Sequence, residues 1–158
     1  MIEERYSVRA ILLTPDEHVL LMRIRAPEGE RHFWIAPGGG LEPSEDVEQG
    51  LRRELLEELG LEAFEIGPVV WRRHHTFNWG QRRISQQEEY RIVRVERFEP
   101  LMSDDAEAAV LDSFRWWRVS DLGRCEEPLT PLSLAAIISN YLTHGAPPEP
   151  LTVERLVD

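Results

Sequence analysis

Apolar residues recur at every fourth position between residues 47 and 59, which is the clearest periodicity in the chain. The stripe consists of Val47, Leu51, Leu55 and Leu59. Residues spaced in this way lie on one face of an α-helix, so the pattern predicts an amphipathic helix with a buried leucine face. Ser44 is the expected N-cap, with Glu45 and Asp46 in the first turn. Gly60 follows as a residue that tolerates the left-handed conformation of a helix end.

Apolar runs with partial alternation predict a series of strands around this helix. They cover residues 6–14, 19–25, 33–35, 64–78, 87–98 and 114–119. Alternation with a period of two is typical of a half-buried strand, and glycine, proline and polar residues separate the runs. A second helix is expected to begin at Thr130-Pro131, with the proline at its first position, and to end near Thr143.

Strands combined with two substantial helices favour an α/β fold class, in which a mixed β-sheet is packed between helices. The chain has 158 residues, of which 42% are hydrophobic, and it contains no internal repeat. We therefore expect a single domain over residues 1–158, with its core at about 6–142 and a C-terminal tail at 145–158.

The helix and the residues ahead of it carry the candidate chemistry. The run Pro37-Gly38-Gly39-Gly40 predicts an irregular loop, because proline lacks a backbone donor and glycine is conformationally permissive. The helix places Glu54, Glu57 and Glu58 within about one turn, beside the leucine stripe and at the edge of an expected cleft. Three acids this close repel one another, and a hard divalent cation such as Mg²⁺ stabilises their ionised forms.

Loop and helix together follow one long pattern, which Trp34-x-x-Pro37-Gly38 precedes. The pattern is Gly39-x5-Glu45-x7-Arg53-Glu54-Leu55-x-Glu57-Glu58-x-Gly60-Leu61. It resembles the Nudix box at every specified position, so the chain is identified as a member of the Nudix hydrolase family, which includes the MutT-like enzymes. The resemblance implies an α/β/α sandwich with a mixed sheet between helices. Many members have glycine where this chain has Ser44, a helix start at which serine is acceptable.

The resemblance also implies an activity and a set of site residues. Nudix proteins are mostly Mg²⁺- or Mn²⁺-dependent pyrophosphohydrolases, which cut a nucleoside diphosphate linked to another moiety. The implied metal ligands are Gly39, through its backbone carbonyl, Glu54, Glu57 and Glu58. Glu54 would be either a further ligand or the base that activates water. Glu45 and Arg53 would brace the loop against the helix.

Members of this family often use one more glutamate outside the box, and three residues are candidates. Glu107 lies in the loop before the strand at 114–119, and Glu88 and Glu89 lie on the strand at 87–98. All three are otherwise expected to be surface charges. The expected catalytic residues are thus Arg53, Glu54 and Glu107.

Pyrophosphate hydrolysis suits these residue types independently of the family. The reaction needs charge neutralisation and a water molecule in line with the leaving group rather than covalent chemistry. A bound metal ion neutralises the phosphates and lowers the pKa of water, and a neighbouring carboxylate takes the proton.

Composition limits the classes of molecule that the protein is expected to bind. The net charge of −11 argues against sequence-independent nucleic-acid binding, although a bound cation permits a nucleotide substrate. Cys125, the single cysteine, fits a reducing cytoplasm. We expect neither a signal peptide nor a membrane span. The predicted partner is a small nucleoside diphosphate derivative, with no nucleic acid and no membrane, and the protein is a monomer or a homodimer.

Residues beyond the box leave the substrate open. The family's marker proline for ADP-ribose-type substrates is absent, since Thr76 and Phe77 stand there, and its tyrosine for dinucleoside polyphosphates is replaced by Asn78 or Trp79. A nucleotide sugar, a (deoxy)nucleoside triphosphate and a small non-nucleotide diphosphate all remain candidates. The nearby arginines either hold a distal phosphate or sugar or form a solvated strand face; they are Arg72, Arg73, Arg82 and Arg83.

Further predictions concern two histidines, a tryptophan and the alternative functions of the protein. The adjacent His74 and His75 face opposite sides of a strand and cannot share a metal ion. Trp79 either stacks on a base or packs within its hairpin. A non-catalytic nucleotide sensor and an isoprenoid-diphosphate isomerase are alternative functions, and the isomerase would require Cys125 to lie near the glycine loop.

Overall fold

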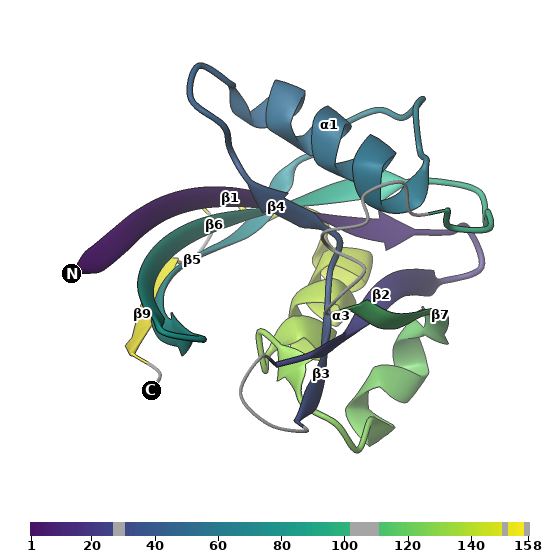
Figure 1. Cartoon of the computed structure of the whole chain (residues 1–158). Coiled ribbons are helices and arrows are strands. Elements are labelled where there is room, and N and C mark those ends of the chain that lie inside the picture. Colours follow the sequence, from purple (N-terminus) through teal and green to yellow (C-terminus); the bar gives the residue numbers. More distant parts are fainter. Residues whose placement is uncertain (27–30, 102–110, 150–151, 157–158) are drawn as a thin grey trace.

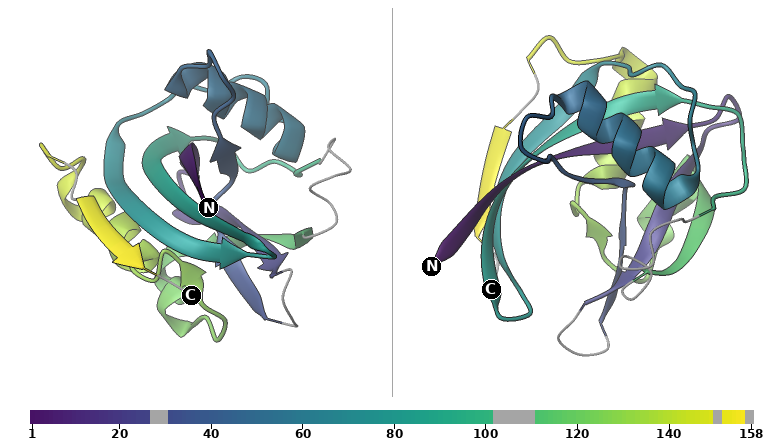
Figure 2. Two further views of the ribbon diagram at one scale, coloured as in Figure 1. Left: turned by 60° about the vertical axis from the view of Figure 1, so that its left-hand side comes forward. Right: turned by 45° about the horizontal axis from the view of Figure 1, so that its top comes forward.

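A computed structural model describes residues 1–26, 31–101, 111–149 and 152–156 of the chain. A curled mixed sheet lies between helix α1 (Val47–Leu59) and helix α3 (Leu134–His144) (Figures 1 and 2). The strands are β1 (Ile2–Leu13), β2 (His18–Arg25), β3 (His32–Ile35), β4 (Gly38–Gly40), β5 (Val69–Trp79), β6 (Arg82–Arg94), β7 (Leu111–Arg118), β8 (Leu129–Thr130) and β9 (Thr152–Leu156). A 3₁₀ helix, η1 (Val119–Arg124), follows β7. This arrangement confirms the fold class expected from the sequence.

The strand order is β8-β3-β2-β1-β6-β5-β9, with β4 added beside β1 and β7 beside β2. Three pairs are parallel, namely β1 with β6, β3 with β8 and β5 with β9, and the others are antiparallel. One edge of β1 pairs with β6 along its whole length, whereas β2 and β4 share the other edge. The run Pro37-Gly38-Gly39-Gly40, called the glycine segment below, therefore lies beside the central strand of the sheet.

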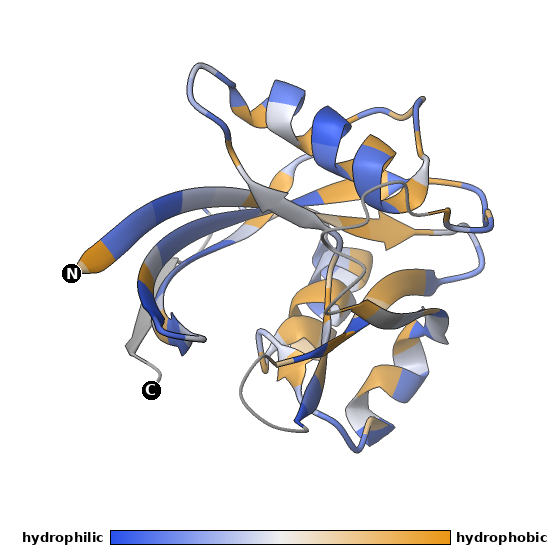
Figure 3. Cartoon of the chain, in the orientation of Figure 1, coloured by the Kyte–Doolittle hydropathy of each residue, from blue (hydrophilic) through white to orange (hydrophobic). Residues whose placement is uncertain are grey.

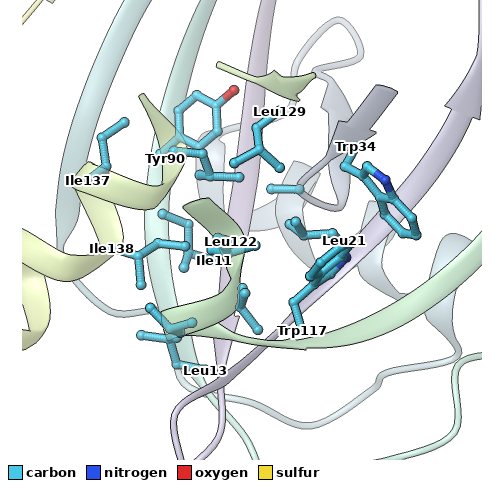
Figure 4. Packing of buried hydrophobic residues seen from close by; sticks show 14 of the residues in the cluster. Ile11, Leu13, Leu21, Trp34, Tyr90, Trp117, Leu122, Leu129, Ile137 and Ile138 are labelled. Carbon is cyan, nitrogen blue, oxygen red and sulfur yellow. The ribbon is translucent and has the colours of Figure 1, made fainter. Parts of the chain in front are cut away.

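Two apolar clusters fill the two sides of the sheet. On the α1 face, Leu51, Leu55 and Leu59 of the predicted stripe pack against alternate residues of β1 such as Val8. On the α3 face, Ile137 and its neighbours pack against Ile11, Leu13 and Tyr90 (Figure 4). Hydrophilic residues predominate where β1, β5 and β6 extend beyond the helices (Figure 3). No helix in the described part of the chain is long and apolar enough to cross a membrane.

Helix α1 begins later than the sequence suggested. Asp46, not Ser44, is the N-cap, because its side chain accepts a 2.8 Å hydrogen bond from the backbone of Gln49 while the Gln49 side chain accepts one from Asp46 N. This reciprocal capping box fixes the start at Val47 and leaves Glu45 outside the helix. Gly60 ends it in the left-handed conformation, as predicted.

The expectation of an irregular loop at Pro37–Gly40 was wrong in part, because Gly38–Gly40 form strand β4 against β1. The missing side chains explain why: a Cβ atom on Gly38 would lie 2.1 Å from the carbonyl oxygen of Val8. Glycine thus serves here to bring two backbones together.

The second helix also starts later than expected. Thr130 belongs to β8, where it pairs with Ile35 of β3, and α3 begins at Leu134. Strand pairing therefore takes precedence over the proline signal for a helix start. In the C-terminal tail, β9 runs parallel to β5.

Candidate active site

Strand β4 and helix α1 bring two of the predicted acids together. The backbone N–H of Gly38 donates a 2.8 Å hydrogen bond to Oε1 of Glu58. A Cβ atom placed on Gly39 would lie 2.6 Å from Oε1 of Glu54, so the absence of a side chain lets this carboxylate approach the backbone. Glu54 and Glu58 are only 5% and 4% exposed. They are therefore buried against the glycine segment rather than displayed at the edge of a cleft.

The register of β4 on β1 decides which backbone groups of the glycine segment point away from the sheet. Gly39 lies opposite Val8, and two residues further along the same pairing Ala10 N donates a hydrogen bond to Pro37 O. Because hydrogen-bonded pairs recur at every second position, Val8 and Gly39 are also such a pair. The backbone carbonyl of Gly39 therefore points toward β1, whereas the backbone N–H and carbonyl of Gly38, in a pair without hydrogen bonds, point away from the β1 backbone. The hydrogen bond from Gly38 N to α1 agrees with this direction.

Arg53 connects the glycine segment with three acids. Its Nε and Nη2 donate to Glu45 at 2.7 and 2.9 Å, and Nη2 also donates to the carbonyl of Gly40 at 2.9 Å. Its Nη1 donates to Glu54 at 2.9 Å and to Glu57 at 3.4 Å. Hydrogen bonding to Arg53 is the largest cause that lowers the pKa of Glu45 to about 2. The contact between Glu45 and Arg53 that the sequence suggested is thus present, although Glu45 precedes the helix.

Oxygen atoms dominate the groups gathered here, and such a donor set suits a hard divalent cation. The guanidinium of Arg53 already bridges Glu54 and Glu57, so these carboxylates accommodate a positive group between them. Across the described residues, no three side chains of His, Cys, Asp or Glu form a ready-made metal cluster. A cation held by the carboxylates here would complete its shell with backbone carbonyls and water, as Mg²⁺ commonly does.

The glutamates considered outside the box have different locations. Glu88 and Glu89 point to opposite faces of β6; Glu89 accepts hydrogen bonds from Tyr6 at 3.2 Å and from Arg91 at 2.6 Å. Both are buried, with 2% and 4% exposure, so the expectation of surface charges was wrong for this pair. Glu107 lies outside the residues that the structure describes.

The arginines around the β5–β6 hairpin do not form one surface. Arg82 pairs with Glu3 at the exposed end of the sheet, which fits a solvated strand face. Arg73 is 7% exposed and donates a 2.6 Å hydrogen bond to Glu88, so the same expectation was wrong for this residue. Nothing in the sequence marked Arg73 as different from its neighbours, because its partner is on another strand.

Aromatic and histidine side chains of β5 have structural contacts. Trp79 packs edge-on against Phe33 of β3, with ring centroids 6.3 Å apart. His74 lies 2.7 Å from the hydroxyl of Ser85, whereas His75 stacks near a neighbouring aromatic ring, in agreement with opposite orientations.

A cavity of about 710 Å³ lies on the α3 face, between β5, α3 and residues 145–149. Trp71, Arg73 and Tyr141 are among its lining residues. None of the described residues that line it belongs to the box, so this cavity and the acids of α1 are separate features of the molecule.

Comparison with known proteins supports one family. A model of the NUDIX domain matches residues 3–138. An RNA pyrophosphohydrolase of Caulobacter vibrioides is 30% identical over 133 residues, which cover 75% of this chain and 74% of that protein. A CTP pyrophosphohydrolase of Escherichia coli is 41% identical over 64 residues, which cover 40% of this chain and 47% of that protein.

Solved structures agree with the sequence relatives. A MutT NUDIX hydrolase from Burkholderia pseudomallei superposes with a TM-score of 0.59 at 25% identity, covering 86% of this chain and 97% of that one. The E. coli ORF135 protein, at 23% identity, has the same fold with a TM-score of 0.62 over 94% of this chain and 96% of that one. The complete box, its placement on β4 and α1, and these matches together show that the chain belongs to the Nudix family of hydrolases.

Proposed function

We propose that the chain is a divalent-metal-dependent pyrophosphohydrolase, which cleaves the diphosphate of a nucleoside diphosphate linked to another moiety. The observation that carries this proposal is the approach of two buried acids, Glu54 and Glu58, to the backbone of Gly38 and Gly39. Carboxylates beside backbone oxygens are the ligands that a metal–phosphate complex requires. Membership of the Nudix family supports the same reaction class.

The metal ligands proposed on the helix are Glu54, Glu57 and Glu58, which would hold Mg²⁺ or Mn²⁺ together with a backbone carbonyl. The sequence pattern assigns that carbonyl to Gly39, whereas the carbonyl of Gly38 lies 3.4 Å from the guanidinium of Arg9. When bound, the cation supplies neutralisation of the phosphate charge and a lowered pKa of bound water.

Side chains of the protein would orient the site and accept the proton. Arg53 holds Oε1 of Glu54 through a 2.9 Å hydrogen bond, and this contact fixes the direction of the carboxylate. In the proposed mechanism Glu54 accepts the proton of the attacking water, which is the task of a general base. Glu107 stays a second candidate for this base on the ground of the sequence alone.

The relatives favour a triphosphate as the substrate. They are named an RNA pyrophosphohydrolase, a CTP pyrophosphohydrolase and nucleoside triphosphatases. The net charge of −11 disfavours a long polyanion, because nucleic-acid binding depends on neutralising many phosphates. We therefore place free nucleoside triphosphates ahead of RNA ends and nucleotide sugars as the substrate class.

The two alternative functions have weaker support. Cys125 packs with the cluster under α3, while the box acids lie on α1 across the sheet, so the thiol is badly placed for isomerase chemistry. Burial also raises the pKa of the Cys125 thiol. A non-catalytic sensor often lacks some of the box carboxylates, and here all of them are present.

Phosphate release with and without a coupling phosphatase tests the proposal. The panel contains nucleoside triphosphates, nucleotide sugars and a 5′-triphosphorylated RNA, each measured in Mg²⁺, Mn²⁺ and EDTA. We expect EDTA-sensitive turnover of free triphosphates, lost in Glu58→Gln and kept in the control Glu62→Gln, an exposed residue just beyond α1. Turnover that survives EDTA, or equal activity of a folded Glu58→Gln protein, would refute the assignment.

A further inference from the structure

A buried charged network lies beneath the glycine segment, on the α3 face of the sheet. At its centre is Glu88, whose side chain is 0% exposed. Its Oε2 accepts hydrogen bonds from Arg9 Nε and from Gln86 Nε2, both at 2.7 Å. Its Oε1 accepts hydrogen bonds from Arg73 Nε at 2.6 Å and from the Tyr90 hydroxyl at 3.1 Å. The carboxylate is thus surrounded by donors from three neighbouring strands.

The network reaches the glycine segment through Arg9. Its Nη1 donates to the carbonyl of Ala36 at 2.9 Å and lies 3.4 Å from the carbonyl of Gly38. The intervening Pro37 carbonyl accepts a 2.8 Å hydrogen bond from the backbone of β1. Each of these carbonyls is therefore contacted by β1 or by its side chain, immediately before Gly38 N binds Glu58 on α1.

The charges of Arg9 and Arg73 keep the carboxylate of Glu88 ionised. Burial raises the pKa of Glu88, but the adjacent Arg9 and Arg73 outweigh it and bring the pKa to about 2, so the carboxylate stays ionised at neutral pH. Two guanidinium groups then face one carboxylate, which leaves excess positive charge beneath the glycine segment. Glu58 is one of the charges that raise the pKa of Arg9, so this excess acts on a box acid.

We propose that Arg9 is a positioning residue: anchored by Glu88, which Arg73 also contacts, it fixes the carbonyls of Ala36 and Gly38 and thereby the orientation of the glycine segment toward Glu58. The role rests on the proposed function of that segment in holding the metal–phosphate complex. Arginine suits the task because its rigid fork reaches a carboxylate and two carbonyls at once, which a lysine ammonium cannot do. Arg9 is outside the box; the β1–β6 pairing brings it to Glu88, and the β1–β4 pairing brings it to the glycine segment.

Arg9→Lys is the direct test, because it keeps the charge and removes the fork. A small displacement of a reacting group costs about a hundredfold in rate, so we expect kcat to fall about tenfold to a hundredfold with KM changed less than about threefold. The matched control is Arg82→Lys, which alters the exposed pair with Glu3 and should behave like wild type.

A second readout needs no turnover. In metal-free protein, amide hydrogen exchange at residues 38–40 should accelerate in Arg9→Lys, while the leucine stripe of α1 keeps its protection. Mn²⁺ binding, followed by electron paramagnetic resonance, should weaken in the same variant. Arg9→Met combined with Arg73→Met and Glu88→Gln removes all three charges of the network together, and it serves if Arg9→Lys does not fold.

The outcomes separate this inference from the proposed function. If wild type proves inactive on every substrate, hydrogen exchange and Mn²⁺ binding still decide the role of Arg9. Unchanged exchange at residues 38–40, a general loss of protection, or an effect confined to KM would overturn it. In the first case Arg9 does not hold the segment, in the second it is a stability residue, and in the third it is a substrate contact.

Discussion

Two clusters of charged side chains lie on opposite sides of the glycine segment, and they differ in their balance of charge. On the α3 face two arginines and two neutral donors converge on the single carboxylate of Glu88. On the α1 face the single guanidinium of Arg53 is shared among Glu45, Glu54 and Glu57. The first group has an excess of positive charge and the second an excess of negative charge. Burial alone therefore does not distinguish a structural acid from a candidate metal ligand; the ratio of cations to carboxylates does.

Glu58→Gln should have the largest effect on activity. The amide oxygen can still accept the hydrogen bond from Gly38 N, so the fold should persist, while the metal loses a charged ligand. Loss of metal-assisted catalysis costs several kcal/mol, and we expect kcat to fall about a thousandfold or more. Steady-state kinetics and circular dichroism measure the two expectations. A drop of less than about tenfold in a folded protein would place Glu58 in the structural group.

Glu88→Gln should affect stability instead. Removal of one partner from a buried ion network leaves Arg9 and Arg73 without their counter-ion, which costs about 3–5 kcal/mol of the free energy of unfolding. Urea denaturation of the variant, compared with Glu62→Gln, measures this loss. Unchanged stability would mean that the carboxylate of Glu88 is not the counter-ion that the comparison assumes.

Arg53→Lys should reduce activity without a large loss of stability. A lysine keeps the charge but cannot bind Glu45, Glu54 and the Gly40 carbonyl together. We expect kcat to fall about tenfold to a hundredfold, since the carboxylate of Glu54 loses its fixed direction. Kinetics in parallel with Arg52→Lys, the half-buried neighbour that pairs with Glu48, supplies the control. Equal losses in both variants would assign the effect to the helix surface.

The smallest expected effect is that of Glu45→Gln on the stability of the fold at acid pH. Its pKa is lowered to about 2 from an ordinary value of 4.5, so its contribution is present above pH 4.5 and is lost as the pH falls toward 2. In Glu45→Gln this loss disappears, and the fall in stability between these pH values should become shallower. Thermal unfolding at a series of pH values measures the slope. An identical slope in both proteins would contradict the proposed pairing with Arg53.

Local patterns predicted helix α1 well. The leucine stripe and the glycine stop are short-range features, and each has its expected place on α1. The three acids also lie on α1, but Glu54 and Glu58 are buried rather than displayed at the edge of a cleft. The start of the helix was missed because Ser44 and Asp46 are both good caps, and only the side chain of Gln49 decides between them. The strand at Gly38–Gly40 was missed because glycine carries no alternation, and its pairing depends on the close approach of β1.

Long-range features were beyond sequence reasoning. The sequence pattern placed Glu88 and Glu89 on a strand, but it could not show that both are buried. Arg9 drew no attention because a single arginine in an apolar strand does not indicate its partner, and Glu88 is that partner only through the parallel β1–β6 pairing. A charged residue within a strand that otherwise alternates toward the core is the signal that could have pointed to the network.

Mn²⁺ binding by wild type, Glu58→Gln and Glu88→Gln tests the central comparison most directly. Electron paramagnetic resonance of free Mn²⁺ gives the affinity without any assumption about substrate. We predict that wild type binds Mn²⁺, that Glu58→Gln loses at least about tenfold in affinity, and that Glu88→Gln, under conditions where it is folded, retains a bound ion. Equal affinity of wild type and Glu58→Gln would contradict the account, because the excess of acids on α1 would then have no role in holding a cation.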